Sequence, residues 1–301
     1  MEQAMQKAAT LIEAMPYIQR FRGKHVVVKF GGAAMEDDRV MDDVLEDVVF
    51  LATVGIRPVL VHGGGKQISA AMKEAGLEAK FVHGHRVTDA ATLEIVVPVL
   101  TGVISADIIR RMEKYGGRAV PGFQDGRSLL RARKKLMPVK AEGGRTQQVD
   151  IGFVGEVESV DIERVVKLAA DGQILVVPPI GQDDAGQLYN VNADTAAAAV
   201  ARDLKAEKVV FLSDVHGIMA DPKDPNSFLS SVDRSEVDRL IKKGIITGGM
   251  MPKVEACLEA VAAGVRKAHI IDGTLHHSLL LEIFTDAGVG TEIVDRSRAG
   301  K

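Results

Sequence analysis

Cysteine is almost absent from this 301-residue sequence, which contains only Cys257. A lone cysteine excludes a disulfide within the chain and a cysteine-based metal site, and it favours a reducing compartment. Long apolar runs are also missing. The longest stretch without a charged residue, 95–106, contains Pro98 and is shorter than the roughly 20 residues of a bilayer-spanning helix. The N-terminal segment lacks the basic start and apolar core of a signal peptide, so we predict a cytoplasmic protein.

An excess of charge of either sign is missing as well. The sequence has 38 basic and 41 acidic residues, a net charge of −3, so bulk electrostatics do not indicate a nucleic-acid-binding protein. We interpret the one local basic run, 127–136, as a solvated loop or helix face.

Several common catalytic signatures are absent. Gln67 follows "GGGK" where a P-loop needs Ser or Thr, and no GxGxxG follows a predicted strand. The sequence contains neither the protein-kinase HRD/DFG set nor a GxSxG nucleophile elbow. His83 and His85 have no third ligand nearby, so we interpret them as polar loop residues rather than a metal pair.

What the sequence does contain is an alternation of apolar runs with amphipathic segments, which predicts an α/β fold with an open, mostly parallel twisted sheet between helices. We expect buried strands at 25–30, 58–62, 173–181, 208–214, 268–273 and 291–295. We expect helices over 40–51, 66–75 and 90–114, from Asp194 onward, over 235–244 and 251–264, and over 277–288, with Ser235 as an N-cap and with Pro98 distorting the third. Residues 116–160 are turn-rich and predict a hairpin lid over one end of the sheet. The predicted organisation is an N-terminal helix (1–22), an N-terminal lobe (23–182) and a C-terminal lobe (183–301).

Two glycine turns follow the first two predicted strands, at Gly31–Gly32 and Gly63–Gly65. Glycine lets backbone N–H groups approach a ligand, and the helix that follows favours an anion. Taken alone, each turn has an ordinary alternative, a tight connection without a chemical role. Together they predict two anionic groups bound side by side.

Charged and polar residues stand near the same predicted edge. Lys29 ends the first apolar run, where burial without an anionic partner is costly, although an edge lysine reaching solvent is the alternative. Lys253 stands in the first turn of a helix. "NVNADT" (190–195) and "FLSDVHGI" (211–218) place further polar residues in turns near this edge. Simple capping or turn formation is the alternative to a binding role for them. Arg86 suits a carboxylate, or an ordinary surface salt bridge.

Six motifs in this order, "VVVKFGG", "LVHGGG", "GHRVTD", "NVNADTAA", "FLSDVHGI" and "GGMMPK", resemble the amino acid kinase family over about residues 22–297. Within it they are similar to the members that phosphorylate N-acetyl-L-glutamate in arginine biosynthesis, and "VDIGFVGEV" (149–157) resembles their hairpin lid. The resemblance implies ATP-dependent phosphorylation of the γ-carboxylate, with Mg²⁺ bound through ATP and no metal ligand from the protein. Other carboxylate kinases, including a carrier-linked one, and a catalytically silent arginine sensor remain alternatives.

The resemblance also implies residue roles. Lys29 would contact the transferring phosphoryl group from the acceptor side and Lys253 from the nucleotide side, with Asp194 holding both. The acceptor would be bound by Gly64, Gly65, Arg86, Asn190 and Asn192, with Arg86 on its α-carboxylate. The nucleotide and phosphates would be bound by Gly31, Gly32, Ser213, Asp214, Gly217, Thr247 and Gly248. Two departures from the family pattern are Ala33, which puts one side-chain hydrogen bond in doubt, and Lys66, which adds a charge beside the acceptor site.

The chain ends resemble arginine-inhibited members, in which an N-terminal helix interlaces dimers into a hexamer. Its stripe of Met5, Ala8, Leu11, Ile12 and Met15 would serve that purpose, or would pack on its own subunit. The arginine-site candidates are Tyr17, Lys208, His277, Glu282, Gly288 and Gly290. The implied partners are the two substrates, L-arginine as inhibitor, other copies of the chain and a PII-type regulator, with no nucleic acid or membrane.

Overall fold

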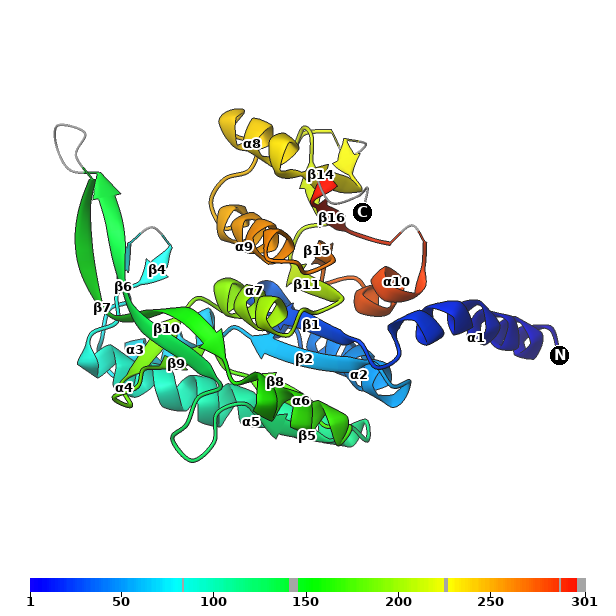
Figure 1. The fold of residues 1–301 in the computed structure, drawn as a ribbon, viewed down its shortest axis with the longest axis horizontal. Coiled ribbons are helices and arrows are strands. Elements are labelled where there is room, and N and C mark those ends of the chain that lie inside the picture. Colours follow the sequence, from blue (N-terminus) through cyan, green and yellow to red (C-terminus); the bar gives the residue numbers. More distant parts are fainter. Residues whose placement is uncertain (83, 141–145, 225–226, 287, 297–301) are drawn as a thin grey trace.

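The computed structural model centres on one eight-stranded sheet of order β14-β16-β15-β11-β1-β2-β8-β5 (Figure 1). It describes residues 1–82, 84–140, 146–224, 227–286 and 288–296. The run from β15 to β5 is parallel, whereas β16 pairs antiparallel with β15. The predicted open, mostly parallel sheet is confirmed. Because β1 pairs directly with β11, the two expected lobes share this sheet.

The strands of the main sheet are β1 (His25–Phe30), β2 (Arg57–His62), β5 (Ala119–Pro121), β8 (Ile174–Val177), β11 (Lys208–Ser213), β14 (Ser231–Asp233), β15 (Lys267–Asp272) and β16 (Thr291–Val294). A closed four-strand sheet contains β6 (Leu130–Lys140), β7 (Thr146–Val160), β9 (Ile180–Gln182) and β10 (Leu188–Val191). Two short pairs are β3 (Phe81–Val82) with β4 (His85–Arg86), and β12 (Ile218–Met219) with β13 (Phe228–Leu229).

The helices are α1 (Glu2–Phe21), α2 (Asp38–Thr53), α3 (Gly65–Glu74), α4 (Ala90–Pro98), α5 (Ser105–Lys114), α6 (Ile162–Ala170), α7 (Ala193–Asp203), α8 (Arg234–Lys242), α9 (Met250–Ala262) and α10 (Ser278–Phe284), with a 3₁₀ turn η1 (Gly32–Met35) and a π-helical segment η2 (Val99–Ile104).

Alternate strand residues bury against opposite helix layers, as strands covered on both faces require. Val27 and Val209 pack with α7 and α9 in one hydrophobic cluster, whereas Val28 and Val210 pack with α2 and α5 in another. The same alternation fixes where polar residues at the strand ends point. Lys29 shares the α7 face with Val27, and His62 shares the α2–α5 face with Leu60.

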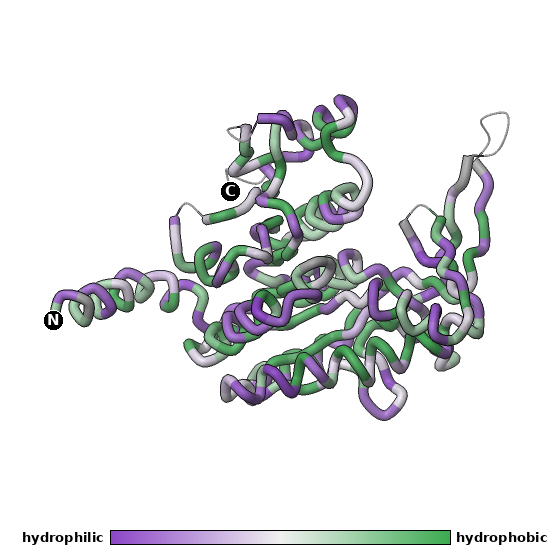
Figure 2. The backbone as a smooth tube through the Cα atoms, turned by 180° about the vertical axis from the view of Figure 1, so that it is seen from behind, coloured by the Kyte–Doolittle hydropathy of each residue, from purple (hydrophilic) through white to green (hydrophobic). Residues whose placement is uncertain are grey.

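The hairpin β6–β7 and helix α1 project from opposite ends of the molecule (Figure 1). Figure 2 shows hydrophilic and hydrophobic residues mixed along α1, and Met5, Leu11 and Ile12 are each more than 60% exposed. The predicted N-terminal helix is therefore confirmed, with its apolar stripe uncovered in the single chain.

Helices α4, η2 and α5 form one continuous helix, Ala90–Lys114, that is long and apolar enough to cross a membrane by length and composition alone. The most apolar part of this helix is 33% buried, and core helices of soluble proteins can have the same length and composition. Pro98 does not end the helix. Instead, a π-helical segment starts directly after it and leads into α5.

Several expected boundaries are wrong. Ala119–Pro121 is an edge strand of the main sheet, so the hairpin begins at Leu130 rather than at 116. The expected strand 173–181 is broken at Pro178–Pro179, because proline cannot donate to the ladder, and it continues as β9 in the smaller sheet. Asp233 rather than Ser235 caps α8, since its carboxylate accepts from Glu236 N at 3.0 Å. Helix α10 ends at Phe284, four residues before the expected end.

Candidate active site

Two lysines converge on one carboxylate at the carboxyl ends of the central strands. Lys29 Nζ, at the end of β1, lies 3.0 Å from Asp194 Oδ1, and Lys253 Nζ, in the first turn of α9, lies 3.1 Å from Asp194 Oδ2. Asp194 stands in the first turn of α7, where the Asn192 side chain caps the helix by accepting from the N–H groups of residues 194 and 195. The structure thus brings the three expected catalytic residues together.

Burial and charge act in opposite directions on this triad. Burial alone would raise the pKa of Asp194, but the two ammonium groups outweigh it and lower that pKa. The pKa of Lys29 is lowered, chiefly by burial and also by Lys253, while Asp194 opposes the shift. Asp194 therefore stays ionised and keeps two positive charges close together. A polyanion arriving between them would be stabilised by both.

A cavity of about 450 Å³ opens beside Lys29. All five expected acceptor-binding residues line it, together with Lys29 and Gly32. The five are Gly64, Gly65, Arg86, Asn190 and Asn192. The cavity is therefore large enough for a small dicarboxylate-sized molecule, within the range of ligand pockets.

Arg86 forms one wall of this cavity, and other residues fix its orientation. Its Nη2 donates to Gly65 O at 2.9 Å and to Ser69 Oγ at 2.8 Å, and its guanidinium lies 4.8 Å from the Phe81 ring centroid. The side chain is held in one place with its remaining N–H groups still able to donate. Such a group suits bidentate binding of a carboxylate.

The two glycine turns meet at this edge. Gly63 N donates to Phe30 O at 2.7 Å, which joins the ends of β1 and β2. A Cβ at Gly31 would lie 3.0 Å from Lys29 Nζ, and Gly32 adopts φ +70°. Position 32 therefore favours glycine for its backbone conformation, and a side chain at Gly31 would have to displace the Lys29 ammonium group.

The hairpin reaches the cavity through β7. Val154 lines the cavity, while Thr88 N donates to Ile151 O at 2.9 Å and Phe153 N donates to Thr88 O at 2.6 Å. Asn190 Nδ2 donates to Thr88 Oγ1 at 3.1 Å. The hairpin is therefore docked onto the segment that carries Arg86.

The expected nucleotide residues lie apart from this cavity. Ser213 ends β11 next to β1 and is buried, whereas Asp214, Thr247 and Gly248 are exposed. Gly217 has φ +136° and packs against Thr291 and Phe228. Thr247 and Gly248 lie just before α9, which carries Lys253, and none of the five lines the cavity beside Lys29.

One of the two departures from the family pattern, Lys66, falls beside the cavity. Lys66 lines its mouth and forms an ion pair with Glu36, which neutralises the added charge. The side chain of Ala33 lies outside the described part of the chain.

Only some of the arginine-site candidates lie together in the structure. Lys208 Nζ lies 3.0 Å from Glu282 Oε1, and Gly288 packs closely on the Glu282 carboxylate. Although burial alone would raise the pKa of Glu282, His269 and Lys208 hold it at about 2. Tyr17 donates to Asp286 at 2.6 Å nearby, and Gly290 lies against the backbone of β15. His277 instead contacts Asp47 of α2.

Sequence reasoning missed three residues at or behind the acceptor cavity. Ser69 and Phe81 hold Arg86, and His62 lies buried behind the Gly63 turn. The antiparallel pairing of Phe81 with Arg86 is set by a two-strand turn too short to leave a periodic signal. For His62, the signal was its place directly before "GGG" at the end of a buried run.

The model of the amino acid kinase family matches residues 24–272. The chain belongs to the amino acid kinase family. It is 47% identical over 294 residues to an acetylglutamate kinase of Heliobacterium modesticaldum, covering 98% of this chain and 100% of that one. An acetylglutamate kinase of Pelotomaculum thermopropionicum is 48% identical over 288 residues, covering 96% and 98% of the two chains.

Solved structures agree on the family fold. N-acetylglutamate synthase from Neisseria gonorrhoeae, complexed with coenzyme A and N-acetyl-glutamate, superposes with a TM-score of 0.77 at 26% identity, over 96% of this chain. This chain spans 63% of that synthase. Carbamate kinase from Giardia lamblia has a TM-score of 0.62 at 18% identity, over 91% of this chain and 99% of that one, and indicates the fold alone.

Proposed function

We propose that this protein transfers the γ-phosphoryl group of ATP to the γ-carboxylate of N-acetyl-L-glutamate, the second step of arginine biosynthesis. The observation that carries the proposal is the Lys29–Asp194–Lys253 arrangement beside a cavity walled by Arg86. The near-full-length similarity to acetylglutamate kinases supports the choice of acceptor.

The proposed chemistry needs positive charge rather than a base. A γ-carboxylate has a pKa near ~4 and is already ionised at neutral pH, so its oxygen attacks the γ-phosphorus directly. The bond from that phosphorus to the β–γ bridging oxygen breaks, and ADP leaves with the electron pair. Lys29 would offset the charge where the acceptor approaches and Lys253 where ADP leaves, while Asp194 keeps both ammonium groups in position.

The donor set also fits the nucleotide. Ammonium groups and the N–H groups of the glycine turns suit phosphate oxygens. Both oxygens of Asp194 are already engaged by lysines, so Mg²⁺ would be held mainly through the β- and γ-phosphates. Ser213, Asp214, Gly217, Thr247 and Gly248 would bind the rest of the nucleotide.

Regulation and assembly complete the proposal. The Lys208–Glu282 pair lies beneath α1, with Lys208 Nζ 5.8 Å from the Phe21 ring centroid, and would supply the carboxylate and cation of an L-arginine site. The uncovered apolar stripe of α1 supports a homo-oligomer in which α1 contacts another copy, a hexamer of three dimers. A cytoplasmic location and a PII-type regulator remain predictions.

The first experiment is ADP release with Mg-ATP and, in parallel, N-acetyl-L-glutamate, glutamate, aspartate and N-acetylaspartate, with hydroxylamine trapping any acyl phosphate. We expect activity with N-acetyl-L-glutamate alone, and its loss in Lys29→Ala. Lys267→Ala is the matched control, because Lys267 also pairs with a carboxylate, Glu292 at 2.7 Å, but lies at the opposite end of its strand. Silence with all four acceptors would contradict the proposed substrate and favour a carrier-bound one.

A further inference from the structure

Two histidines and two aspartates gather away from the active-site cavity, where α2 meets the connection between β15 and α10. His276 Nδ1 lies 2.6 Å from Asp43 Oδ2, and His277 Nδ1 lies 2.6 Å from Asp47 Oδ1. The two imidazole rings lie 3.9 Å apart between centroids. One ligand-type atom from each of Asp43, His276 and His277 falls within 4.8 Å of the other two.

We propose that Asp43, His276 and His277 form a binding site for a divalent transition metal of the Zn²⁺ class. Zn²⁺ binds imidazole nitrogen and carboxylate oxygen at about 2.0–2.2 Å, and three protein ligands leave a fourth position for water. Two imidazoles and one carboxylate match this preference. They do not match Mg²⁺, which takes oxygen ligands. The site is therefore separate from the Mg²⁺ that would arrive with ATP.

Asp47 contacts His277 in the way that a carboxylate commonly contacts a metal-binding histidine. It is 1% exposed, and its contact with Nδ1 leaves Nε2 of the same ring available for a metal. A carboxylate behind a ligating histidine fixes the ring orientation and raises its basicity. The other oxygen of Asp47, Oδ2, is buried and has no hydrogen-bond partner among the described residues. A cation bound to His277 would offset this buried negative charge.

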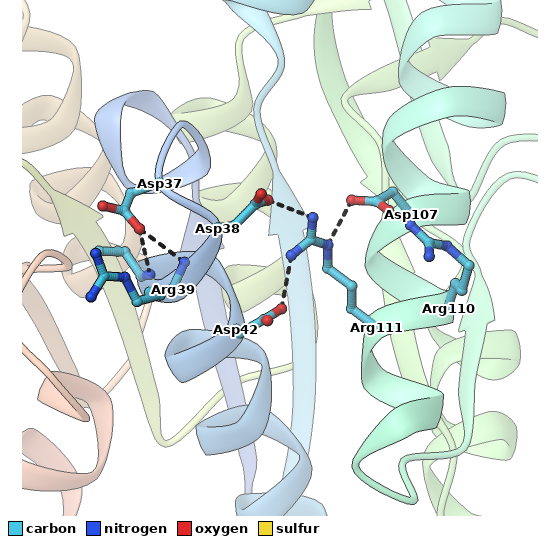
Figure 3. Close-up of polar contacts among 8 residues, drawn as sticks. Asp37, Asp38, Arg39, Asp42, Asp107, Arg110 and Arg111 are labelled. Carbon is cyan, nitrogen blue, oxygen red and sulfur yellow. Dashed lines mark hydrogen bonds and ion pairs between the residues drawn. The ribbon is translucent and has the colours of Figure 1, made fainter.

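The surrounding charge also favours a cation. Between Asp37 and Asp47 the sequence has six acidic residues and one arginine. Figure 3 shows how part of this charge is neutralised from the neighbouring helix: Arg111 of α5 contacts Asp38 at 2.6 Å and Asp42 at 2.8 Å. Asp43 and Asp47 point instead to the two histidines.

The ligands have room to move onto a metal. Side chains around a tetrahedral Zn²⁺ place their donor atoms about 3.3 Å apart, so the three atoms, which now lie within 4.8 Å of one another, must close by up to about 1.5 Å. The His276 side chain is 73% exposed, and Asp43 is at the surface of α2. The metal would then join α2 to the start of α10, which belong to the two predicted lobes.

The alternative is that the four residues form two ordinary ion pairs without metal affinity. The test is a Zn²⁺ titration of the untagged, chelator-treated full chain, without ATP, by calorimetry and by competition with a chromophoric chelator. We expect one Zn²⁺ per chain and at least tenfold weaker binding in both His276→Ala and Asp43→Asn. A raised thermal midpoint with Zn²⁺ should vanish in the same variants. Neither variant touches the proposed catalytic residues.

The chain offers a matched control in His216. It is similarly exposed and lies 2.7 Å from Asp272, but it belongs to no three-ligand cluster among the described residues. His216→Ala should leave Zn²⁺ binding unchanged. Binding that survives His276→Ala and Asp43→Asn, binding that His216→Ala weakens equally, or no stoichiometric binding at all would each overturn the proposal. Because the readout is binding, the result is independent of whether the proposed kinase activity is found.

Discussion

His62 and Ser105 share a buried hydrogen bond that joins the end of β2 to the start of α5. His62 Nε2 lies 2.8 Å from Ser105 Oγ, and Nδ1 lies 2.8 Å from Gly63 O. Burial lowers the pKa of His62 to about 4, so the ring is neutral at pH 7, with Nδ1–H donating to Gly63 O. The Ser105 hydroxyl lies between two acceptors, His62 Nε2 at 2.8 Å and Leu100 O at 3.0 Å. Leu100 and Ile104 of η2 press on Gly64 from the same side. The acceptor turn is therefore shaped by the helix behind it.

Removing the serine hydroxyl should loosen this turn. In Ser105→Ala, the imidazole acceptor is left buried and unpaired, which should lower the free energy of unfolding by about 1–3 kcal/mol. The KM for N-acetyl-L-glutamate should rise more than kcat falls, since the change affects the position of the binding loop. Chemical denaturation and steady-state kinetics measure the two effects.

Thr101→Val is the control for this prediction. Thr101 Oγ1 donates only to Val97 O at 2.8 Å in the same helix, so its loss should change stability by about 0.5 kcal/mol or less. Equal effects of the two substitutions would contradict a special role for the His62–Ser105 contact.

The same histidine predicts a pH dependence of stability. Its pKa falls from 6.5 in the unfolded chain to about 4 in the fold, so between these values the unfolded state binds more protons. The contribution of neutral His62 to the free energy of unfolding is therefore complete above pH 6.5, and it is lost as the pH falls toward 4. The full loss is about 3 kcal/mol at 1.36 kcal/mol per pKa unit.

Urea unfolding between pH 4.5 and 7.5 in wild type and His62→Gln measures this contribution as a difference. Asp47 acts in the opposite direction, because burial raises its pKa to about 6 despite His277. It does so in both proteins, and its effect cancels in the comparison. A pH slope that is the same in His62→Gln as in wild type would rule out His62 as its source.

The features best predicted from the sequence are the strands and helices with long periodic patterns, and the residues at their ends. The apolar runs before Lys29 and His62, the alternation that turns Lys29 toward α7, and the Asn–Asp pair that opens α7 together predicted the centre of the site. The apolar runs are local patterns repeated over several residues, and the Asn–Asp pair is a capping signal carried by residue type. Arg86 was found through its chemistry, and its place in the cavity through the family resemblance.

The missed features depend on contacts that are distant in sequence. The Ala119–Pro121 strand is too short to show a period and is defined by pairing with β8. Ser105 lies 43 positions from His62 and follows a π-helical segment, Val99–Ile104, whose geometry leaves no periodic signal in the sequence. Asp233 and Ser235 are equally good N-caps by residue type, and tertiary geometry chose between them. His277 was grouped with Glu282 through the family resemblance, but its ring turns toward Asp47 of α2.

The catalytic role proposed for Lys29 and Lys253 predicts how their substitution changes the rate. Lys29→Met and Lys253→Met should each lower kcat by about 10²–10³-fold, the usual effect of removing one group that stabilises developing charge. Asp194→Asn should lower kcat and also destabilise the fold by about 3–5 kcal/mol, because two lysines then lack their carboxylate. Steady-state kinetics and denaturation of the three variants test this. An Asp194→Asn protein with wild-type kcat would contradict its positioning role.

Docking of the hairpin depends on Gly152. It adopts φ +89°, and an added Cβ would overlap the Thr88 carbonyl oxygen. Gly152→Ala should therefore separate β7 from the segment that carries Arg86 and raise the KM for the acceptor. Gly186→Ala is the matched control, since Gly186 has φ +87° but open space around it, and should cost only the conformational penalty of about 1–2 kcal/mol. Proteolysis of the hairpin and acceptor KM should separate the two variants.

The exposed apolar stripe of α1 predicts that the chain assembles with other copies in solution. Leu11 and Ile12 are 66% and 63% exposed in the single chain, so burying them against another copy would stabilise an assembly. Leu11→Asp with Ile12→Asp, or deletion of residues 1–20, should reduce the proposed hexamer to dimers and abolish the proposed inhibition by L-arginine. Thr10→Asp adds a charge to the opposite side of the helix and should change neither. Light scattering and inhibition curves measure both properties, and a deletion variant that keeps its size and arginine response would refute the role of α1.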